Sequence, residues 1–186
     1  TVQQVSVAGL GNASAIVCYA WQYYHSDYRR YYDYANCFLA SVSGTTLTAG
    51  AELRISSSRL DFLSVAVLDA SDGVGIMCYR DQANYNRGTC KVLSSMGTSM
   101  QAGREHVFYT NTVAYVSVTA IGDRSAVVCY TYMYTSNPGH CRCKVLSASW
   151  EGAYGSWGVT SGTELAIQTS GTSYIRYIST SALDAS

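Results

Sequence analysis

Seven cysteines are the residues of this 186-residue chain whose spacing most clearly suggests chemistry. One pair of them per repeated segment predicts one disulfide per repeat, and therefore an oxidising compartment outside the cytosol. Each bond would close a loop of about 12 to 20 residues and so restrict the unfolded chain. The predicted pairs are Cys18 with Cys37, Cys78 with Cys90, and Cys129 with Cys143.

Cys141 is left without a partner in this scheme. It follows Cys129 at the same spacing that separates Cys78 from Cys90, so a bond between Cys129 and Cys141 is the alternative. We favour Cys143 because its Cys-Lys-Val-Leu-Ser segment aligns with that of Cys90 without a gap. Cys141 is then a free thiol or forms an intermolecular bridge. Zinc binding is the rival interpretation, but only residues 140–143 cluster possible ligands, and we predict no metal site.

An aromatic segment over residues 21–34 is the first candidate binding surface. Tyr, Trp and Arg dominate binding hot spots, and the rings of Tyr and Trp combine apolar faces with polar edges. A glycan or a protein would fit such a surface. The alternative is a long hairpin whose rings cover a neighbouring repeat. The candidate residues are Trp21, Tyr23, Tyr24, Tyr28, Arg29, Arg30, Tyr31 and Tyr32.

A second aromatic segment covers residues 150–157, where Trp150, Tyr154 and Trp157 stand among glycines. Aromatic rings on such a loop could form a platform for a sugar, and loops often carry function. The same rings could instead close the edge of the core.

Glu52, Glu105 and Glu164 recur in a Gly-x-Glu motif. A catalytic carboxylate pair is normally asymmetric, so a contact repeated in every copy is the better interpretation. Neither Gly-x-Ser-x-Gly nor His-Glu-x-x-His occurs, and we predict no catalytic residues and no cofactor.

Two other sequence features concern ions and glycans. Asp81, Asn84 and Asn86 could bind calcium, although their spacing matches no complete calcium loop. Asn12 begins an Asn-Ala-Ser sequon within a predicted turn, which is consistent with N-glycosylation of a secreted protein.

These residues are positioned by a repeat that occurs three times and begins a fourth. Its core reads hydrophobic-hydrophobic-Cys-Tyr, then Cys with a short apolar run, then Gly-x-Glu. A period of about 50 to 60 residues indicates an array of one supersecondary unit. The repeats cover about residues 2–60, 61–113 and 114–174, with the start of a fourth at about 175–186.

Each repeat divides into four runs typical of β-strands. No stretch keeps an apolar 3.6-residue period, and the short runs are rich in Val, Ile, Tyr and Thr and end at Gly, Ser, Asn or Asp. The second run is apolar on both faces, as in residues 126–130, which predicts a strand between two packed layers.

The predicted fold is therefore all-β, with repeats of four-stranded antiparallel units that resemble the blades of a β-propeller. A β-trefoil, a β-prism, another sandwich or a solenoid are the alternatives. Since residues 175–184 begin another copy, the array is not expected to close after three units. Repeat arrays end in polar caps, and neither end shows one, so further repeats or another subunit should cover both ends.

The sequence rhythm of Val-Cys-Tyr, Cys-Lys-Val-Leu-Ser and Gly-x-Glu-Leu resembles tandem repeats in large secreted or surface proteins of microalgae and other protists. The resemblance covers nearly the whole chain. It implies a repetitive extracellular protein and supplies no site residues.

Composition narrows the function further. The formal net charge is zero and the pI is near 6.7, so nucleic acid is not an expected partner. No apolar run has the length of a membrane span, and no signal peptide is evident, so we interpret the chain as a mature or excised segment. We expect a non-enzymatic structural or adhesive module at the cell surface or in an extracellular assembly. A lectin-like glycan binder and a fragment of a secreted enzyme are the alternatives, and expected partners are other subunits, further repeats or glycans.

Overall fold

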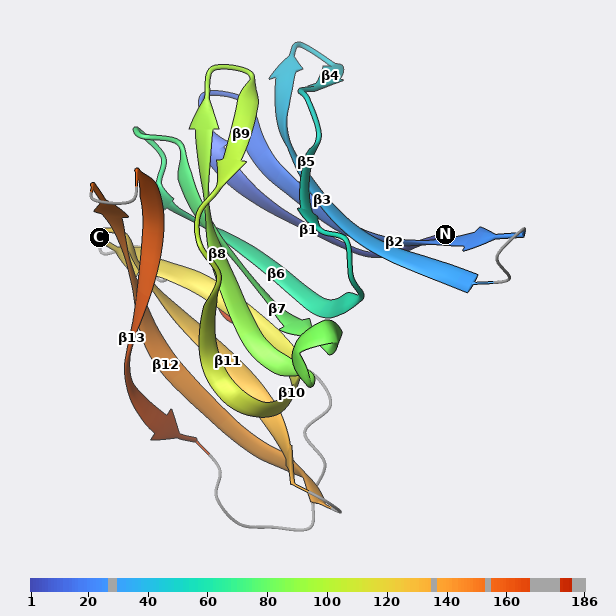
Figure 1. Cartoon of the computed structure of the whole chain (residues 1–186). Coiled ribbons are helices and arrows are strands. Elements are labelled where there is room, and N and C mark those ends of the chain that lie inside the picture. Colours follow the sequence, from blue (N-terminus) through green and yellow to red (C-terminus); the bar gives the residue numbers. More distant parts are fainter. Residues whose placement is uncertain (27–29, 135–136, 153–154, 168–177, 182–186) are drawn as a thin grey trace.

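A computed structural model describes residues 1–26, 30–134, 137–152, 155–167 and 178–181, and it is all-β with antiparallel sheets (Figure 1). This part contains thirteen strands and one short 3-10 turn, η1 (Gln82–Asn84). No sheet in the described part closes on itself. The strands are β1 (Val2–Gly11), β2 (Ser14–His25), β3 (Arg30–Ser43), β4 (Thr46–Ala49), β5 (Leu53–Ser56), β6 (Leu60–Asp69), β7 (Val74–Asp81), β8 (Arg87–Met96), β9 (Ser99–Ala102), β10 (His106–Gly122), β11 (Ser125–Tyr134), β12 (Asn137–Glu151) and β13 (Ser156–Ala166).

Each repeat is an up-and-down unit of three strands and a fourth edge strand, which is broken into two pieces in repeats 1 and 2 and is the continuous β13 in repeat 3. In repeat 1 the order is β1-β2-β3, and β4 and β5 both pair with β3. Repeats 2 and 3 share one hydrogen-bonded sheet because β10 belongs to both. Its residues 106–112 pair with β8, and its residues 113–122 pair with β11. The predicted boundary near residue 113 therefore lies inside a continuous strand.

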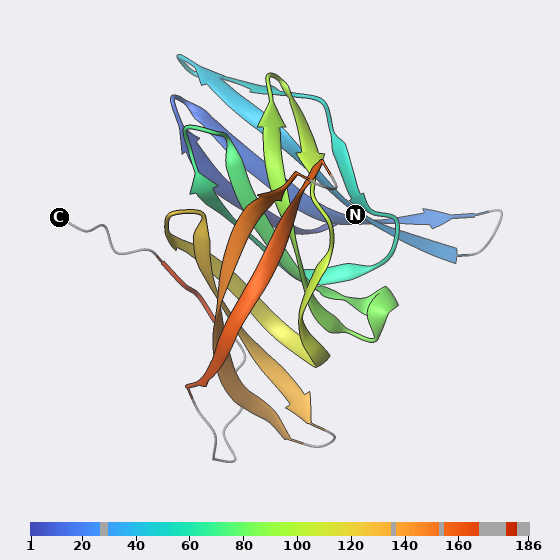
Figure 2. The ribbon, with the colours of Figure 1, turned by 60° about the vertical axis from the view of Figure 1, so that its left-hand side comes forward.

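The three repeats lie next to one another in chain order, with repeat 2 in the middle (Figures 1 and 2). The middle position of repeat 2 explains why nearly all residues of β7 are buried. A strand that is covered on both faces reads as a continuous apolar run, as the sequence predicted for this position. Repeats 1 and 3 each have one covered face and one outer face.

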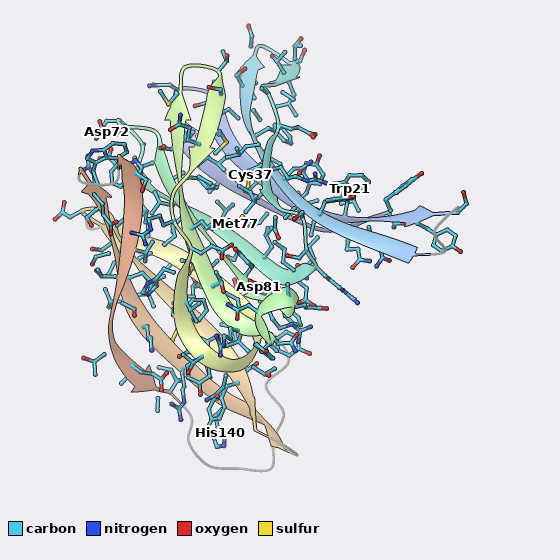
Figure 3. The ribbon with its side chains drawn as sticks, viewed as in Figure 1. Trp21, Cys37, Asp72, Met77, Asp81 and His140 are labelled. Atoms are coloured by element: carbon cyan, nitrogen blue, oxygen red, sulfur yellow. A yellow bond between two sulfur atoms is a disulfide. The ribbon has the colours of Figure 1, made fainter. Side chains whose placement is uncertain are left out.

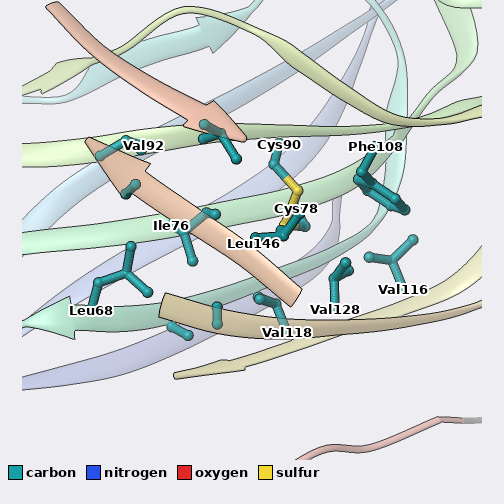
Figure 4. Close-up of a cluster of buried hydrophobic side chains, with 14 of the residues drawn as sticks. Leu68, Ile76, Cys78, Cys90, Val92, Phe108, Val116, Val118, Val128 and Leu146 are labelled. Atoms are coloured by element: carbon teal, nitrogen blue, oxygen red, sulfur yellow. A yellow bond between two sulfur atoms is a disulfide. The ribbon is translucent and has the colours of Figure 1, made fainter. Parts of the chain in front are cut away.

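Two apolar cores fill the spaces between adjacent repeats. Strand side chains alternate between faces, so each repeat gives one set of side chains to each neighbour. The core between repeats 1 and 2 includes Ile16, Cys18, Cys37, Ile55, Leu63, Val65, Met77, Leu93 and Met100. The core between repeats 2 and 3 is shown in Figure 4, and it includes Leu68, Ile76, Cys78, Cys90, Val92, Phe108, Val116, Val118, Val128 and Leu146.

A serine on the first strand of each repeat links it to the next repeat. Its hydroxyl oxygen accepts a hydrogen bond from a backbone amide at the same relative position each time. The three bonds are Val65 N to Ser6 Oγ at 3.0 Å, Val118 N to Ser64 Oγ at 3.1 Å, and Thr180 N to Ser117 Oγ at 3.1 Å. Residues 178–181 thus begin a third interface of the same kind as the first two.

The glycine of each Gly-x-Glu motif marks a second contact between repeats. A Cβ atom at Gly50 would lie 2.6 Å from the carbonyl oxygen of Thr98 in repeat 2. A Cβ atom at Gly103 would overlap the carbonyl oxygen of Trp157 in repeat 3. Glycine is required at both places because the backbone of the following repeat approaches so closely.

A lysine from the third strand reaches back to the preceding repeat. Lys91 Nζ donates to the carbonyl oxygen of Ile55 at 3.0 Å, and Lys144 Nζ donates to that of Phe108 at 2.8 Å. Phe38 stands at the equivalent position of repeat 1.

One disulfide joins the second and third strands of every repeat, and the three bonds are the predicted ones. The cysteines face each other directly across the ladder, with Cα atoms 4.1 to 4.2 Å apart. Cys141 lies opposite Thr131, is buried, and forms no disulfide, and burial raises the pKa of its thiol. A raised pKa reduces the thiolate fraction, so this thiol is poorly suited to redox chemistry.

Candidate functional site

The most unusual surfaces of the described chain are the two outer faces, which we call the N-face and the C-face. The N-face is the uncovered side of repeat 1 and presents Val5, Val7 and Leu47. The C-face is the outer side of repeat 3, where residues 178–181 reach Ser117, and among the described residues it presents Ile121 and Val145, together with Leu165 and Ile167. Several exposed large apolar side chains on one face of a sheet favour an interaction site.

Residues at the positions that match the N-face are buried in the other repeats, where they contact a preceding repeat. Val7 is 58% exposed, whereas Val65 and Val118 at the same repeat position are 6% and 5% exposed. Leu47 is 69% exposed, whereas its equivalent Met100 is 6% exposed. The residue types are alike, and only the presence of a preceding repeat differs.

The C-face shows the same difference in exposure between matching positions. Ile121 is 55% exposed, whereas Leu10 and Leu68 at the matching positions are each 7% exposed. Ile167 is also exposed, and its equivalents Ile55 and Phe108 are buried against the following repeat.

The first predicted aromatic surface lies on the long β2–β3 hairpin, which projects from the body of the molecule (Figures 1 and 3). The Trp21 ring packs on Tyr34, with centroids 5.1 Å apart, and on Tyr23 at 6.4 Å. The guanidinium of Arg54 lies 4.0 Å from the centroid of the Tyr34 ring. Trp21 Nε1 is buried without a hydrogen-bond partner, while the Tyr23 and Tyr24 side chains are exposed.

The other predicted residues of this surface are placed only in part. Arg30, Tyr31 and Tyr32 belong to β3, where their backbones face His25, Tyr24 and Tyr23. Tyr28 and Arg29 lie outside the described residues. The segment is a long hairpin, on which the Trp21 ring contacts the rings of Tyr23 and Tyr34 in tilted arrangements.

The second aromatic surface lies at the β12–β13 hairpin, beside a cavity of about 270 Å³. Trp150 and Trp157 face each other across the hairpin, with ring centroids 5.8 Å apart in an edge-to-face arrangement. Trp157 packs under Arg124 at 5.1 Å, whereas Trp150 is exposed. Tyr154 lies outside the described residues. Leu53, Ser94, Gln101, Ala102, Gly103, Gly155 and Ser156 complete the lining.

The recurring glutamates have a repeated structural contact, as predicted. Each accepts a hydrogen bond from the tyrosine of the Cys-Tyr pair in its own repeat. Burial, together with the neighbouring carboxylate, raises the pKa of Tyr79 and Tyr130, so both phenols remain donors. The pairs are Tyr19 with Glu52 at 2.5 Å, Tyr79 with Glu105 at 3.4 Å, and Tyr130 with Glu164.

The weaker sequence candidates have local structural roles. The Asp81 carboxylate caps η1 by accepting from the amides of Ala83 and Asn84. Within the described residues, no three His, Cys, Asp or Glu side chains gather in a way that could hold a metal ion. Asn12 is exposed in the β1–β2 turn, where a positive φ of 47° suits asparagine.

An acidic cluster links repeats 2 and 3 at the turn between β6 and β7. The Ser71 hydroxyl, the Asp72 amide and the Arg124 guanidinium all donate to Asp69 and lower the pKa of its carboxyl to about 2. Arg124 also pairs with Asp72, which is labelled in Figure 3.

Sequence reasoning missed the serine bonds and the exact location of the outer apolar faces. The signal for the serines was present, because Ser6, Ser64 and Ser117 occupy one position of a largely apolar run, and Ser179 holds the same position in the fourth copy. The exposure of Val7 and Ile121 carries no such signal, because it depends on what lies next to each repeat.

No described helix is long and apolar enough to cross a membrane. Comparison of the chain with protein-family models, with curated proteins and with solved structures found no match in any of the three.

Proposed function

We propose that this chain is a non-enzymatic, extracellular structural or adhesive module, in which propeller-like repeats join through one recurring interface. The observation that carries the proposal is the repetition of that interface. The hydrogen bond to the serine of the first strand recurs at all three boundaries between repeats. The close approach of the next repeat's backbone to Gly50 and Gly103 recurs at the two boundaries where both repeats are complete. A surface that is reused in this way supports a role in assembly, in which each unit is a partner for the next.

The three disulfides support the extracellular part of the proposal. Each disulfide links two strands of one repeat, and those of repeats 1 and 2 lie in the apolar cores between repeats. Disulfides persist in oxidising environments and are rare in the cytosol. Three disulfides and the lack of a membrane-spanning helix in the described part are compatible with this location.

The experiment that tests the proposal measures the location and thiol state of the protein in its source cells. Cells are fractionated, and the chain is alkylated under denaturing conditions before and after reduction. We expect the chain in the surface or extracellular fraction, with one alkylated cysteine before reduction and seven after it. A cytosolic chain with all its thiols reactive before reduction would contradict the proposal.

Glycan binding is the second candidate, and the exposed ring of Trp150 beside its cavity favours it. Sugars stack on exposed aromatic faces, and the neighbouring Ser94 and Gln101 could bond to hydroxyl groups. Trp157 is less suited to contact a sugar because Arg124 covers its ring.

A glycan array with purified protein tests this second function. If the cavity binds sugars, Trp150→Ala is expected to reduce binding at least tenfold, because aromatic anchors contribute much of the energy of such contacts. Tyr85→Ala is the matched control, since Tyr85 is an exposed ring at the end of η1 and belongs to neither aromatic surface. Equal binding by Trp150→Ala and the wild type, or no saturable binding to any glycan, would reject the cavity as a lectin site.

A further inference from the structure

We infer that this chain associates head to tail with further copies of itself, with the N-face of one copy packing on the C-face of the next. The inference rests on the proposed function and names the partner of the same surface. Its occupant is a second copy, because each outer face is built like one half of an interface that the chain already forms twice.

The apolar residues of the two faces are continuous with the internal interfaces. Leu63, Val65 and Met100 line the core between repeats 1 and 2, and Val5, Val7 and Leu47 are their equivalents on the N-face. On the C-face, Ile121 and Ile167 match Leu68 and Phe108 of the core between repeats 2 and 3. Pairing the two faces therefore repeats an established contact and requires no new kind of packing.

The backbone also leaves room for a following repeat at the C-face. Gly162 is the glycine of the third Gly-x-Glu motif, and it corresponds to Gly50 and Gly103. A Cβ atom there would meet nothing closer than 3.6 Å, whereas at the other two glycines it would collide with the next repeat. The space beside Gly162 is therefore open, whereas the backbone of the following repeat occupies the same space beside Gly50 and Gly103. In a head-to-tail pair, the backbone near Thr45 of the second copy would occupy it.

One segment of the chain already occupies part of the C-face. Thr180 bonds to Ser117, and Thr180 matches Val7 in the repeat alignment. The β1 strand of an arriving copy would therefore take the place of residues 178–181. It would also bring β2, β3 and β4 with their apolar side chains, so it buries more surface than the segment that it displaces.

A head-to-tail contact joins two different surfaces, so it is heterologous. Such a contact gives a ring when the rotation closes and an open filament when it does not. A heterologous contact also predicts that blocking either face stops self-association of that chain. A chain blocked on its N-face and a chain blocked on its C-face should still form one pair.

The test measures mass by light scattering over a dilution series, with the full chain in the oxidised state. Wild type is expected to grow in mass with concentration. Val7→Asp blocks the N-face and Ile121→Asp blocks the C-face, so each variant alone is expected to be a monomer. An equimolar mixture is expected to form a dimer and nothing larger, because the C-face of the Val7→Asp variant can pair with the N-face of the Ile121→Asp variant and no other unblocked face remains.

Two further variants test the details of the interface. Gly162→Val is expected to block association without loss of folding, since its side chain enters space that is open in the single chain. Thr180→Pro removes both the amide and the hydroxyl that bond to Ser117, and it is expected to strengthen association about threefold or more, in line with the loss of two competing hydrogen bonds. Circular dichroism and disulfide mapping confirm that each variant is folded.

Several outcomes would overturn the inference. These are a wild-type monomer at every concentration, self-association of the Val7→Asp or Ile121→Asp variants, and a mixture that stays monomeric. A wild-type monomer found outside the cell with three intact disulfides rejects the inference and leaves the proposed function standing. A cytosolic, reduced chain rejects the proposed function, whatever the scattering shows.

Discussion

Replacing both Cys78 and Cys90 with alanine is expected to lower the free energy of unfolding by about 2 to 5 kcal/mol. The disulfide closes a short loop in the middle repeat, and both sulfur atoms lie in the core between repeats 2 and 3. The unfolded chain gains conformations when the bond is removed, and the core loses two well-packed sulfur atoms. Equilibrium denaturation under non-reducing conditions measures the change.

The matched control is Cys141→Ala, which removes a buried cysteine that forms no disulfide. We expect a much smaller loss of stability from this variant, because the three covalent links remain. Removal of Cys129 and Cys143 provides a second comparison at the end of the array, where no complete repeat covers the bond. An unchanged denaturation midpoint for the Cys78→Ala/Cys90→Ala variant would show that the central disulfide does not stabilise the fold.

Val65→Asp is expected to abolish folding, whereas Val7→Asp is expected to change the stability of the single chain by less than about 0.5 kcal/mol. The two valines hold the same place in neighbouring repeats. Val65 is enclosed between repeats 1 and 2, and an unpaired carboxylate there costs several kcal/mol, a large part of the roughly 5 to 15 kcal/mol that stabilises a domain. Val7 lies on the open N-face, so a carboxylate there stays hydrated.

Near-ultraviolet circular dichroism and urea denaturation of the two purified variants check this expectation, at a concentration low enough to keep the chain monomeric. Equal destabilisation by the two substitutions would mean that the N-face is covered within the single chain. That result would also remove the basis for head-to-tail association.

Much of the strand layout and all three disulfides follow from the sequence. The continuous apolar run around Cys18, Cys78 and Cys129 is a local property of the chain, and the facing cysteines then fix the pairing of the second and third strands. The recurrence of Glu105 and Glu164 was enough to indicate a structural contact, although their tyrosine partners lie far away in the sequence, on β7 and β11.

The candidate binding residues were less predictable. The sequence treats Trp21, Trp150 and Trp157 alike, as aromatic residues in inserted loops. The tertiary structure packs Trp21 on Tyr34, covers Trp157 with Arg124 and leaves Trp150 exposed. These differences depend on residues that are distant along the chain, so no local pattern contains them.

The sequence by itself determined the repeat, its strands and its covalent links, because these depend on residue order within one unit. The tertiary structure decided which copies of an identical position are buried. Val7 and Val65 share the same local pattern, yet one is open and the other enclosed, since burial depends on whether another repeat lies against that face. The same physical reason explains why only the folded chain shows Ser117 bonded to Thr180 and Gly162 facing open space.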